Sequence, residues 1–217
     1  MNLKDLMQVV QENDLKEEQF LKLSEEDQRK YLWAKQEYIR IVKSQKLLLY
    51  KPNPKLKPFH DSSSTIRAIF GGNRSGKTTC GGMEFLFHIT GQYPDWYPKE
   101  LRYHNPIKGR IGAKDFQKGV GEVIIPFLEE WLDMTLIKRK IRNPMGVPIK
   151  WILKNGSVFD ILTYEQSVDS YEGWKGHIAW FDEPPPRDKY IATLRGLVDY
   201  RGRSWLTLTP LDRKSVV

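Results

Sequence analysis

Hydrophobic and polar positions follow a helical period in residues 1–50 and a mixed period after residue 66. In the first part, two groups of apolar residues recur every three or four positions. The groups are Leu3, Leu6, Met7 and Val10, then Tyr31, Ala34, Tyr38, Ile41 and Val42. Ser24 and Asp27 form a capping-box-like start to the second helix, which we expect to end near Tyr50.

A proline-punctuated connector follows the predicted helices. Pro52, Pro54 and Pro58 fall within residues 51–58, a run that cannot continue a helix. We therefore divide the chain into an N-terminal helical segment, residues 1–50, and a second domain, residues 51–217.

The second domain alternates apolar runs with helical patterns. Strands are predicted at 66–70, 109–114, 178–181 and 205–208, with two more inside 151–164 joined by a turn at Asn155-Gly156. Helices are predicted at 79–90 and 120–132. This alternation favours an α/β fold with a mostly parallel central sheet flanked by helices.

Composition limits the number of domains and the kinds of site. With 217 residues and 40% hydrophobic content, the chain can bury one good-sized core plus an appendage. Cys80 is the single cysteine, which excludes a disulfide framework and a C-x-x-C metal site. The four histidines have no zinc-ligand spacing, and no run approaches the ~18 apolar residues of a membrane span. We expect a soluble protein with no membrane partner.

Charge is distributed unevenly along the chain. Residues 1–50 hold equal numbers of basic and acidic residues, so the formal net charge of +8 lies in residues 51–217. Basic clusters occur at Lys138-Arg139-Lys140 with Arg142, and at Arg195, Arg201 and Arg203. Such clusters fit a nucleic-acid backbone and equally fit a basic, soluble surface.

A phosphate-binding loop follows the strand predicted at 66–70. The run has the pattern G-x-x-x-x-G-K-[ST] and consists of Gly71, Gly72, Asn73, Arg74, Ser75, Gly76, Lys77, Thr78 and Thr79. Glycines allow the tight turn that points backbone N–H groups at an anion. Lys77 can reach the β and γ phosphates and Thr78 can ligate Mg²⁺, so the sequence predicts a nucleotide site.

An acidic pair suggests hydrolysis at that site. Asp182 and Glu183 come directly after the strand predicted at 178–181, which is apolar throughout, as a strand buried on both faces should be. Asp182 can hold the Mg²⁺ hydration shell, and Glu183 can orient and deprotonate an attacking water.

Four motifs together resemble the ATPase half of the large terminase subunits of tailed bacteriophages. They are residues 71–79, Ser170-Tyr171-Glu172-Gly173, Trp180-Phe181-Asp182-Glu183-Pro184-Pro185 and Leu206-Thr207-Leu208-Thr209-Pro210-Leu211. The resemblance covers residues 52–212 and implies a P-loop NTPase fold of the additional-strand, catalytic-glutamate type. It implies a motor that hydrolyses ATP with Mg²⁺ and moves double-stranded DNA into a procapsid.

The resemblance also implies roles for further residues. Thr207 and Thr209 fall in a coupling motif, where a hydroxyl could bond the attacking water or the phosphate. Arg74 is similar to an arginine that contacts the γ phosphate, although Asn73 holds the usual position. Trans-acting finger candidates are Arg195, Arg201 and Arg203, with Lys175 as a further option. Phe59 could stack on the base and Leu56 line its pocket.

Partners and location follow from the same resemblance. A portal protein, a small terminase subunit and a homo-oligomeric ring are implied, with a monomer as the isolated form, in the host cytoplasm at the procapsid portal. The family's C-terminal nuclease domain has no counterpart in these 217 residues, so we expect no nuclease activity. Two alternatives stay open: a helicase-like DNA remodelling ATPase, and a non-catalytic nucleotide-gated assembly module.

Overall fold

The computed structural model describes residues 20–210 and divides the chain into two compact units, between Lys46 and Leu47. The division lies four residues before the boundary proposed from the sequence. Its cause is that Leu47 and Tyr50 are buried in the core of the second unit. The short helix predicted around Leu3 lies outside the described residues.

The first unit contains helix α3, Glu25–Ser44. Ser24 caps it, because its Oγ accepts a hydrogen bond from the Asp27 amide at 3.2 Å, which confirms the predicted start. The predicted continuation to Tyr50 is wrong. The helix stops at Ser44, and a separate short helix, α4, spans Lys46–Leu49.

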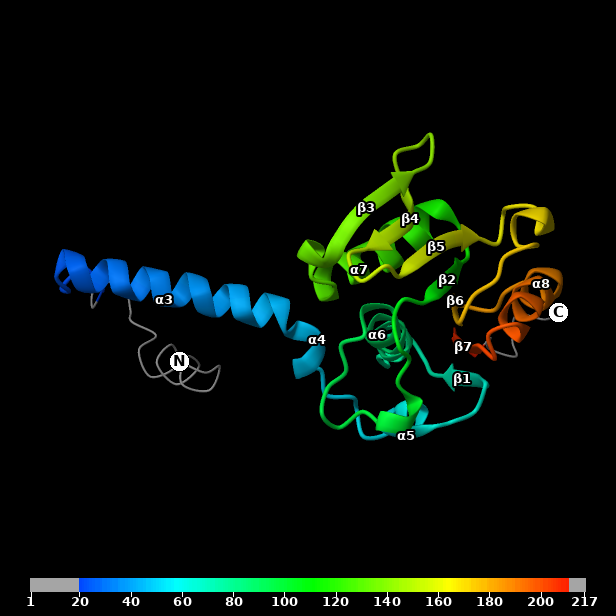
Figure 1. Ribbon diagram of the computed structural model, residues 1–217, viewed down its shortest axis with the longest axis horizontal. Helices are drawn as coiled ribbons and strands as arrows, with labels where there is room; N and C mark the ends of the chain where they lie inside the picture. Colours follow the sequence, from blue (N-terminus) through cyan, green and yellow to red (C-terminus); the bar gives the residue numbers. More distant parts are fainter. Residues whose placement is uncertain (1–19, 211–217) are drawn as a thin grey trace. The chain divides into compact units, whose positions relative to one another are not determined.

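The second unit is built on a seven-stranded sheet (Figure 1). Its strands are β1 Ile66–Phe70, β2 Lys108–Ala113, β3 Ile137–Arg142, β4 Pro148–Leu153, β5 Val158–Thr163, β6 Ile178–Asp182 and β7 Arg203–Leu208. The spatial order is β1-β7-β6-β2-β5-β4-β3. The five strands β1, β7, β6, β2 and β5 pair with their neighbours in parallel. Strand β4 pairs with β5, and β3 with β4, in the antiparallel sense. The mostly parallel α/β fold is confirmed, and β7 is the additional strand between β1 and β6.

Helices cover both faces of the sheet. They are α5 Lys57–Asp61, α6 Lys77–Thr90, the π-helical η2 Phe116–Ile124 that continues into α7 Ile125–Trp131, and α8 Arg187–Val198. Short 3-10 turns are η1 Lys99–Leu101, η3 Met134–Leu136 and η4 Val168–Ser170. The helix predicted at 79–90 is confirmed, whereas the one predicted at 120–132 begins earlier and its first part is π-helical. The connector is shorter than predicted, because Pro58 lies in the first turn of α5.

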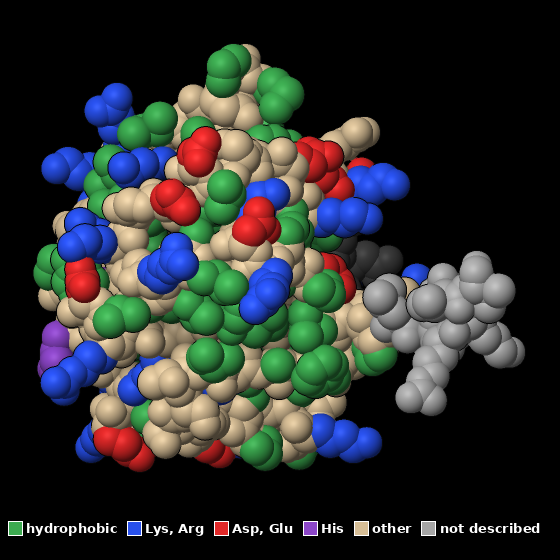
Figure 2. Space-filling model, turned by 90° about the vertical axis from the view of Figure 1, so that its right-hand side faces the viewer, with side chains coloured by type: hydrophobic (Ala, Val, Ile, Leu, Met, Phe, Trp, Pro, Cys, Tyr) green, Lys and Arg blue, Asp and Glu red, His purple; other side chains and the backbone are tan. Residues whose placement is uncertain are grey.

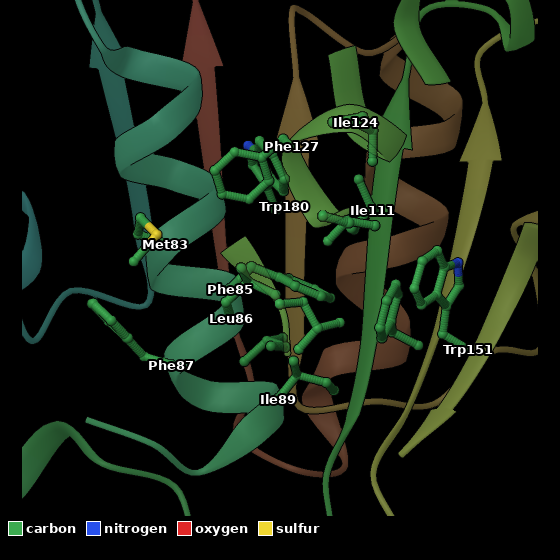
Figure 3. Close-up of a cluster of buried hydrophobic side chains, with 14 of the residues drawn as sticks. Met83, Phe85, Leu86, Phe87, Ile89, Ile111, Ile124, Phe127, Trp151 and Trp180 are labelled. Atoms are coloured by element: carbon green, nitrogen blue, oxygen red, sulfur yellow. The ribbon is translucent and has the colours of Figure 1, made fainter. Parts of the chain in front are cut away.

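Helix α6 packs closely on β6 and β7, and two glycines make this approach possible. A Cβ at Gly81 would lie 2.5 Å from Thr207 Cγ2, and one at Gly82 would lie 2.4 Å from Phe127. Trp205 also donates its indole N–H to the Gly81 carbonyl at 3.0 Å. Figure 3 shows the resulting core, in which side chains of α6 meet Trp180, Phe127 and Ile111.

A buried carboxylate lies on the side of α6 that faces α5 and β1. Glu84 is fully buried, and its oxygens lie 2.7 Å from Arg67, 2.7 Å from His60 Nδ1 and 3.2 Å from His88 Nε2. Tyr97 donates its hydroxyl to the same carboxylate at 2.9 Å. Burial alone would raise the pKa of Glu84, but Arg67 and the two histidines hold it well below 4.5. The anion therefore fixes α6 against β1 and α5.

Replacing Glu84 by glutamine should lower the free energy of unfolding by about 3–5 kcal/mol, because Arg67 then stays buried without its carboxylate. Urea titration measures the effect as a lower midpoint at an unchanged slope. Glu122→Gln, at an exposed position on η2, is the control and should change stability by less than about 0.5 kcal/mol. Equal losses in the two variants would contradict the ion-pair account.

Stability should also fall as the pH drops below the ordinary histidine pKa of 6.5. Burial lowers the pKa of His88. Glu84 raises this pKa in part, and the charges of Arg67 and Arg203 lower it further. Below pH 6.5 the unfolded chain therefore binds a proton at His88 that the folded chain does not bind. The contribution of the neutral His88 to the free energy of unfolding is present above pH 6.5 and is lost as the pH falls. Urea midpoints between about pH 7 and pH 5 should drop less in His88→Gln than in wild type.

The exposed His104 provides the matched control for that experiment. His104→Gln should keep the wild-type pH dependence. Part of the dependence should remain in His88→Gln, because burial and Lys108 also lower the pKa of His177. An unchanged slope in His88→Gln would overturn the assignment to His88.

Candidate functional site

The phosphate loop joins β1 to α6 and turns through left-handed backbone conformations. Gly76 has φ 83° and Arg74 has φ 62°, a conformation that a non-glycine residue adopts at some cost. Gly71 donates its N–H to the Leu208 carbonyl at 3.1 Å, so β7 anchors the loop entrance. No side chain caps the N-terminus of α6, which leaves its first backbone N–H groups available to an anion.

Lys77 begins α6 and lies almost fully buried beside the acidic pair. Its Nζ is 3.9 Å from Glu183 Oε1, which is ion-pair range but too far for a hydrogen bond. A cavity of about 250 Å³ opens over the loop and is lined by residues 74–79. The structure therefore brings the loop, the lysine and Glu183 together, as the sequence predicts.

Asp182 ends β6 and faces the start of α6. Its Oδ1 accepts hydrogen bonds from Thr78 Oγ1 at 3.1 Å and Thr207 Oγ1 at 2.7 Å. Burial raises the pKa of Asp182 above its ordinary value of 3.8. The two threonine hydroxyls and the charge of Lys77 lower this pKa, but burial has the larger effect. A cation at this position would offset that burial and keep the carboxylate ionised.

Glu183 is the first residue after β6, and its backbone turns sharply there. It has φ 67°, while its amide still pairs with the Thr207 carbonyl at 2.9 Å. Thr209 Oγ1 donates to Oε1 at 2.6 Å and the Thr209 amide to Oε2 at 3.2 Å. Tyr164 holds the turn by donating its hydroxyl to the Glu183 carbonyl at 2.8 Å. The acidic pair thus consists of two carboxylates with separate partners.

The donor set fits a nucleotide with magnesium. Thr78 Oγ1 and Asp182 Oδ1 are 3.1 Å apart, close to the separation of about 3 Å between neighbouring oxygens in an octahedral Mg²⁺ shell. Lys77 and the uncapped N-terminus of α6 supply positive charge and N–H donors beside them. These residues can therefore hold a phosphate and a divalent cation together.

Phe59 lies at a second cavity next to the loop. This cavity, of about 460 Å³, is lined by Leu56, Phe59 and Arg67 among others. Leu56 borders the loop, because a Cβ at Gly76 would lie 3.7 Å from its Cδ1. The Arg67 guanidinium lies over the Phe59 ring at 4.6 Å, and the ring is partly buried against the core.

The predicted arginines are divided between two places. Arg74 is exposed and lines the loop cavity. Arg195, Arg201 and Arg203 are not brought to this site, because they lie near the end of α8, in the turn after it and at the first residue of β7. Arg203 is engaged there, donating to the Leu101 carbonyl at 2.9 Å and stacking over Tyr103.

Thr207 takes a place different from the one expected. It is fully buried, and its hydroxyl is used by Asp182 and by the Trp180 indole N–H at 3.0 Å. The hydroxyl therefore does not face a water or a phosphate. Sequence reasoning also missed Tyr164 and Trp180 as supports of the acidic pair. Trp180 has a recognisable signal, an indole two residues before a carboxylate on the same strand face.

Comparisons with known proteins agree with this arrangement. Residues 68–216 match the family described as terminase large subunit, T4likevirus-type, N-terminal. A curated relative, the terminase large subunit of Salmonella phage P22, is 27% identical over 231 residues, which cover 87% of this chain and 45% of the relative. The chain thus spans less than half the length of that relative.

Solved structures share the fold at low sequence identity. The large terminase ATPase domain of Thermus phage P74-26 has a TM-score of 0.51 and 18% identity, covering 76% of this chain and 68% of that one. A large terminase from a thermophilic bacteriophage has a TM-score of 0.52 and 15% identity, covering 77% and 38%. The fold is the P-loop fold of these domains, and the chain belongs to the terminase large subunit family.

Proposed function

We propose that residues 51–217 form an ATPase that couples hydrolysis of Mg²⁺-bound ATP to movement of double-stranded DNA into a viral procapsid. The observation that carries the proposal is the acidic pair, in which Asp182 lies 3.1 Å from the loop threonine and Glu183 lies 3.9 Å from the loop lysine. Family membership and the folds of the ATPase domains named above support the same interpretation.

Each residue of the site has a distinct task in this proposal. Lys77 and the backbone N–H groups at the start of α6 bind the β and γ phosphates. Thr78 and Asp182 hold magnesium, which when bound offsets the negative charge of the phosphate oxygens. Glu183 orients a water and accepts its proton. Phe59 and Leu56 offer an apolar place for the base, and Arg74 can reach the γ phosphate from the loop.

The coupling strand β7 controls both carboxylates. Thr207 binds Asp182 from within the sheet, and Thr209 binds Glu183 at the strand end. In this geometry each Glu183 oxygen accepts one hydrogen bond from Thr209, which leaves a lone pair on each oxygen for a water. A shift of the Thr209–Pro210 segment would move the carboxylate relative to that water. Strand β7 is therefore the element that would link the chemistry to movement of the following chain.

Partners and location belong to the same proposal. Double-stranded DNA, a portal protein, a small terminase subunit and a ring of identical subunits fit the motor, at the procapsid portal in the host cytoplasm. A ring also allows an arginine to act in trans, for which Arg195 and Arg201 are exposed. No helix among residues 20–210 has the length and apolar composition to cross a membrane.

Glu183→Gln should slow phosphate release from ATP by about 10²–10⁴-fold while ATP binding remains, because the amide cannot accept the water's proton. Steady-state turnover with and without blunt duplex DNA is the measurement, and duplex should stimulate the wild-type rate. Glu100→Gln, an exposed carboxylate on η1, is the control and should keep full activity.

The outcomes separate the competing functions. Equal turnover in wild type and Glu183→Gln would remove Glu183 from catalysis. ATP binding without turnover in any protein, including an assembled ring, would favour the nucleotide-gated module. Unwinding of a forked duplex would favour the helicase-like ATPase.

Thr207→Val and Thr209→Val should produce different defects. Thr207→Val removes a hydroxyl that positions Asp182, so the Mg²⁺ concentration for half-maximal turnover should rise by about 10-fold. Thr209→Val leaves Asp182 supported and should lower the maximal rate at saturating Mg²⁺, because Glu183 loses the hydroxyl that positions it. A magnesium titration of turnover distinguishes the two. The same defect in both variants would contradict the assignment of one threonine to each carboxylate.

A further inference from the structure

The sheet face opposite α6 is unevenly covered. Helix α8 packs over its centre, where Ala179, Phe181 and Leu197 form a small core. On the β1 side, exposed Ile66 and Phe70 leave an apolar flank. Figure 2 views the side on which α8 lies and shows hydrophobic side chains gathered in the middle of that surface, with charged side chains around them. The other flank, over β2, β4 and β3, carries basic side chains instead.

Strand register places three exposed cations on this second flank. Lys108 of β2 pairs with Val158, Val158 with Ile152, and Ile152 with Arg139 of β3, so Lys108 and Arg139 share one row and one face. Lys150 of β4 lies in the next row, beside Asp160. We call Lys108, Arg139 and Lys150 the basic sheet face. Three strand spacings separate Lys108 from Arg139, about 14 Å.

The positive charge of this face is not neutralised within the described residues. Asp160 is its facing carboxylate, and Arg110 already binds both Asp160 oxygens, at 3.0 and 2.8 Å. None of the three cations lies within the 4.0 Å ion-pair distance of a carboxylate in residues 20–210. A cavity of about 500 Å³ lies over the face, lined by Lys108, Lys150 and Lys175 among others. Lys175 is paired with Asp199.

We propose that the basic sheet face binds the phosphate backbone of duplex DNA. The inference rests on the proposed function and names the surface that meets the DNA. Cations spread over about 14 Å, across strands rather than along one, match a rigid rod whose charge repeats every few ångströms. An extended acidic peptide would instead add along the edge strand β3 through its main chain.

The same surface disfavours a single strand. Unpaired bases bind on free aromatic faces, and the tryptophan of this cavity is Trp174. Trp174 is only partly exposed: the Arg110 guanidinium lies 4.5 Å from its ring centre, and the ring also packs against Gly176 and Gly196, where a Cβ would lie 2.2 and 2.8 Å from its atoms. Backbone phosphates therefore supply the contacts that this face can make.

The test compares two double variants with the same loss of charge. Lys108→Gln with Lys150→Gln removes two cations of the basic sheet face, and Lys99→Gln with Lys118→Gln removes two exposed cations on η1 and η2. Fluorescence anisotropy with a short blunt duplex, between about 50 and 200 mM salt, gives the slope of log affinity against log salt. The first pair should lower that slope by about 2 and weaken binding, and the second should leave it unchanged.

Further arms keep the result interpretable. ATP turnover without DNA should be the same in the Lys108/Lys150 variant and wild type, so loss of DNA binding is separated from failure of the ATPase proposal. Equal slopes in both double variants, or no duplex binding by wild type at low salt, would overturn the proposal. So would competition by single-stranded DNA or polyglutamate that matches duplex at equal charge.

Discussion

The close approach of α6 to β6 and β7 is the contact on which the rest of the site depends. It requires glycine at positions 81 and 82, since a Cβ at Gly81 would lie 2.5 Å from Thr207 of β7 and one at Gly82 would lie 3.0 Å from Trp180 of β6. The approach fixes the start of the helix as well as its middle: with α6 against the sheet, Thr78 comes within 3.1 Å of Asp182. The same packing buries Thr207 under the helix, where its hydroxyl has Asp182 and Trp180 as partners. Packing and chemistry are therefore set by one helix position.

Two buried carboxylates, Glu84 and Asp182, lie on or beside α6, and their surroundings differ. Glu84 is surrounded by Arg67 and two histidines, so it stays ionised in the core and binds the helix to α5 and β1. Burial raises the pKa of Asp182 and two neutral hydroxyls are its hydrogen-bond partners, which leaves room for a cation. Cys80 adds a neutral group to the surroundings of Glu84. Its Sγ lies 3.2 Å from His60 Nε2, and burial raises the pKa of the thiol. The structural carboxylate of Glu84 and the carboxylate of Asp182, which we propose to bind a cation, thus differ in their hydrogen-bond partners rather than in their burial.

Local signals in the sequence predicted most of the strands and the nucleotide loop. Strands β1, β2, β4, β5, β6 and β7 are short apolar runs, and the glycine-rich loop has a fixed spacing. Among the strands and the longer helices, two elements were missed for physical reasons. β3 carries four cations in six residues and is an edge strand. Because none of its residues is fully buried, its sequence does not alternate between apolar and polar side chains. α8 has a weakly amphipathic sequence and is held by contacts with Phe181 and Tyr171, which are remote in sequence. The Glu84–Arg67 pair and the Thr207–Asp182 bond likewise join residues 17 and 25 positions apart, which no local period can reveal.

Lys108 of the basic sheet face and the acidic pair lie at opposite ends of two neighbouring parallel strands. Lys108 is the first residue of β2, whereas Asp182 is the last residue of the neighbouring β6. Buried, hydrogen-bonded strands are stiff, so a change at one end is passed on as movement of the strands or of the loops that follow them. If the proposed nucleotide and DNA sites are coupled, linkage makes the effect reciprocal: the factor by which nucleotide changes DNA affinity equals the factor by which DNA changes nucleotide affinity. The proposed motor requires that factor to differ from one, since a ligand that binds two conformations equally well does not shift the equilibrium between them. The Thr209–Pro210 segment, which leaves β7 while bound to Glu183, is the place where such a difference can become motion.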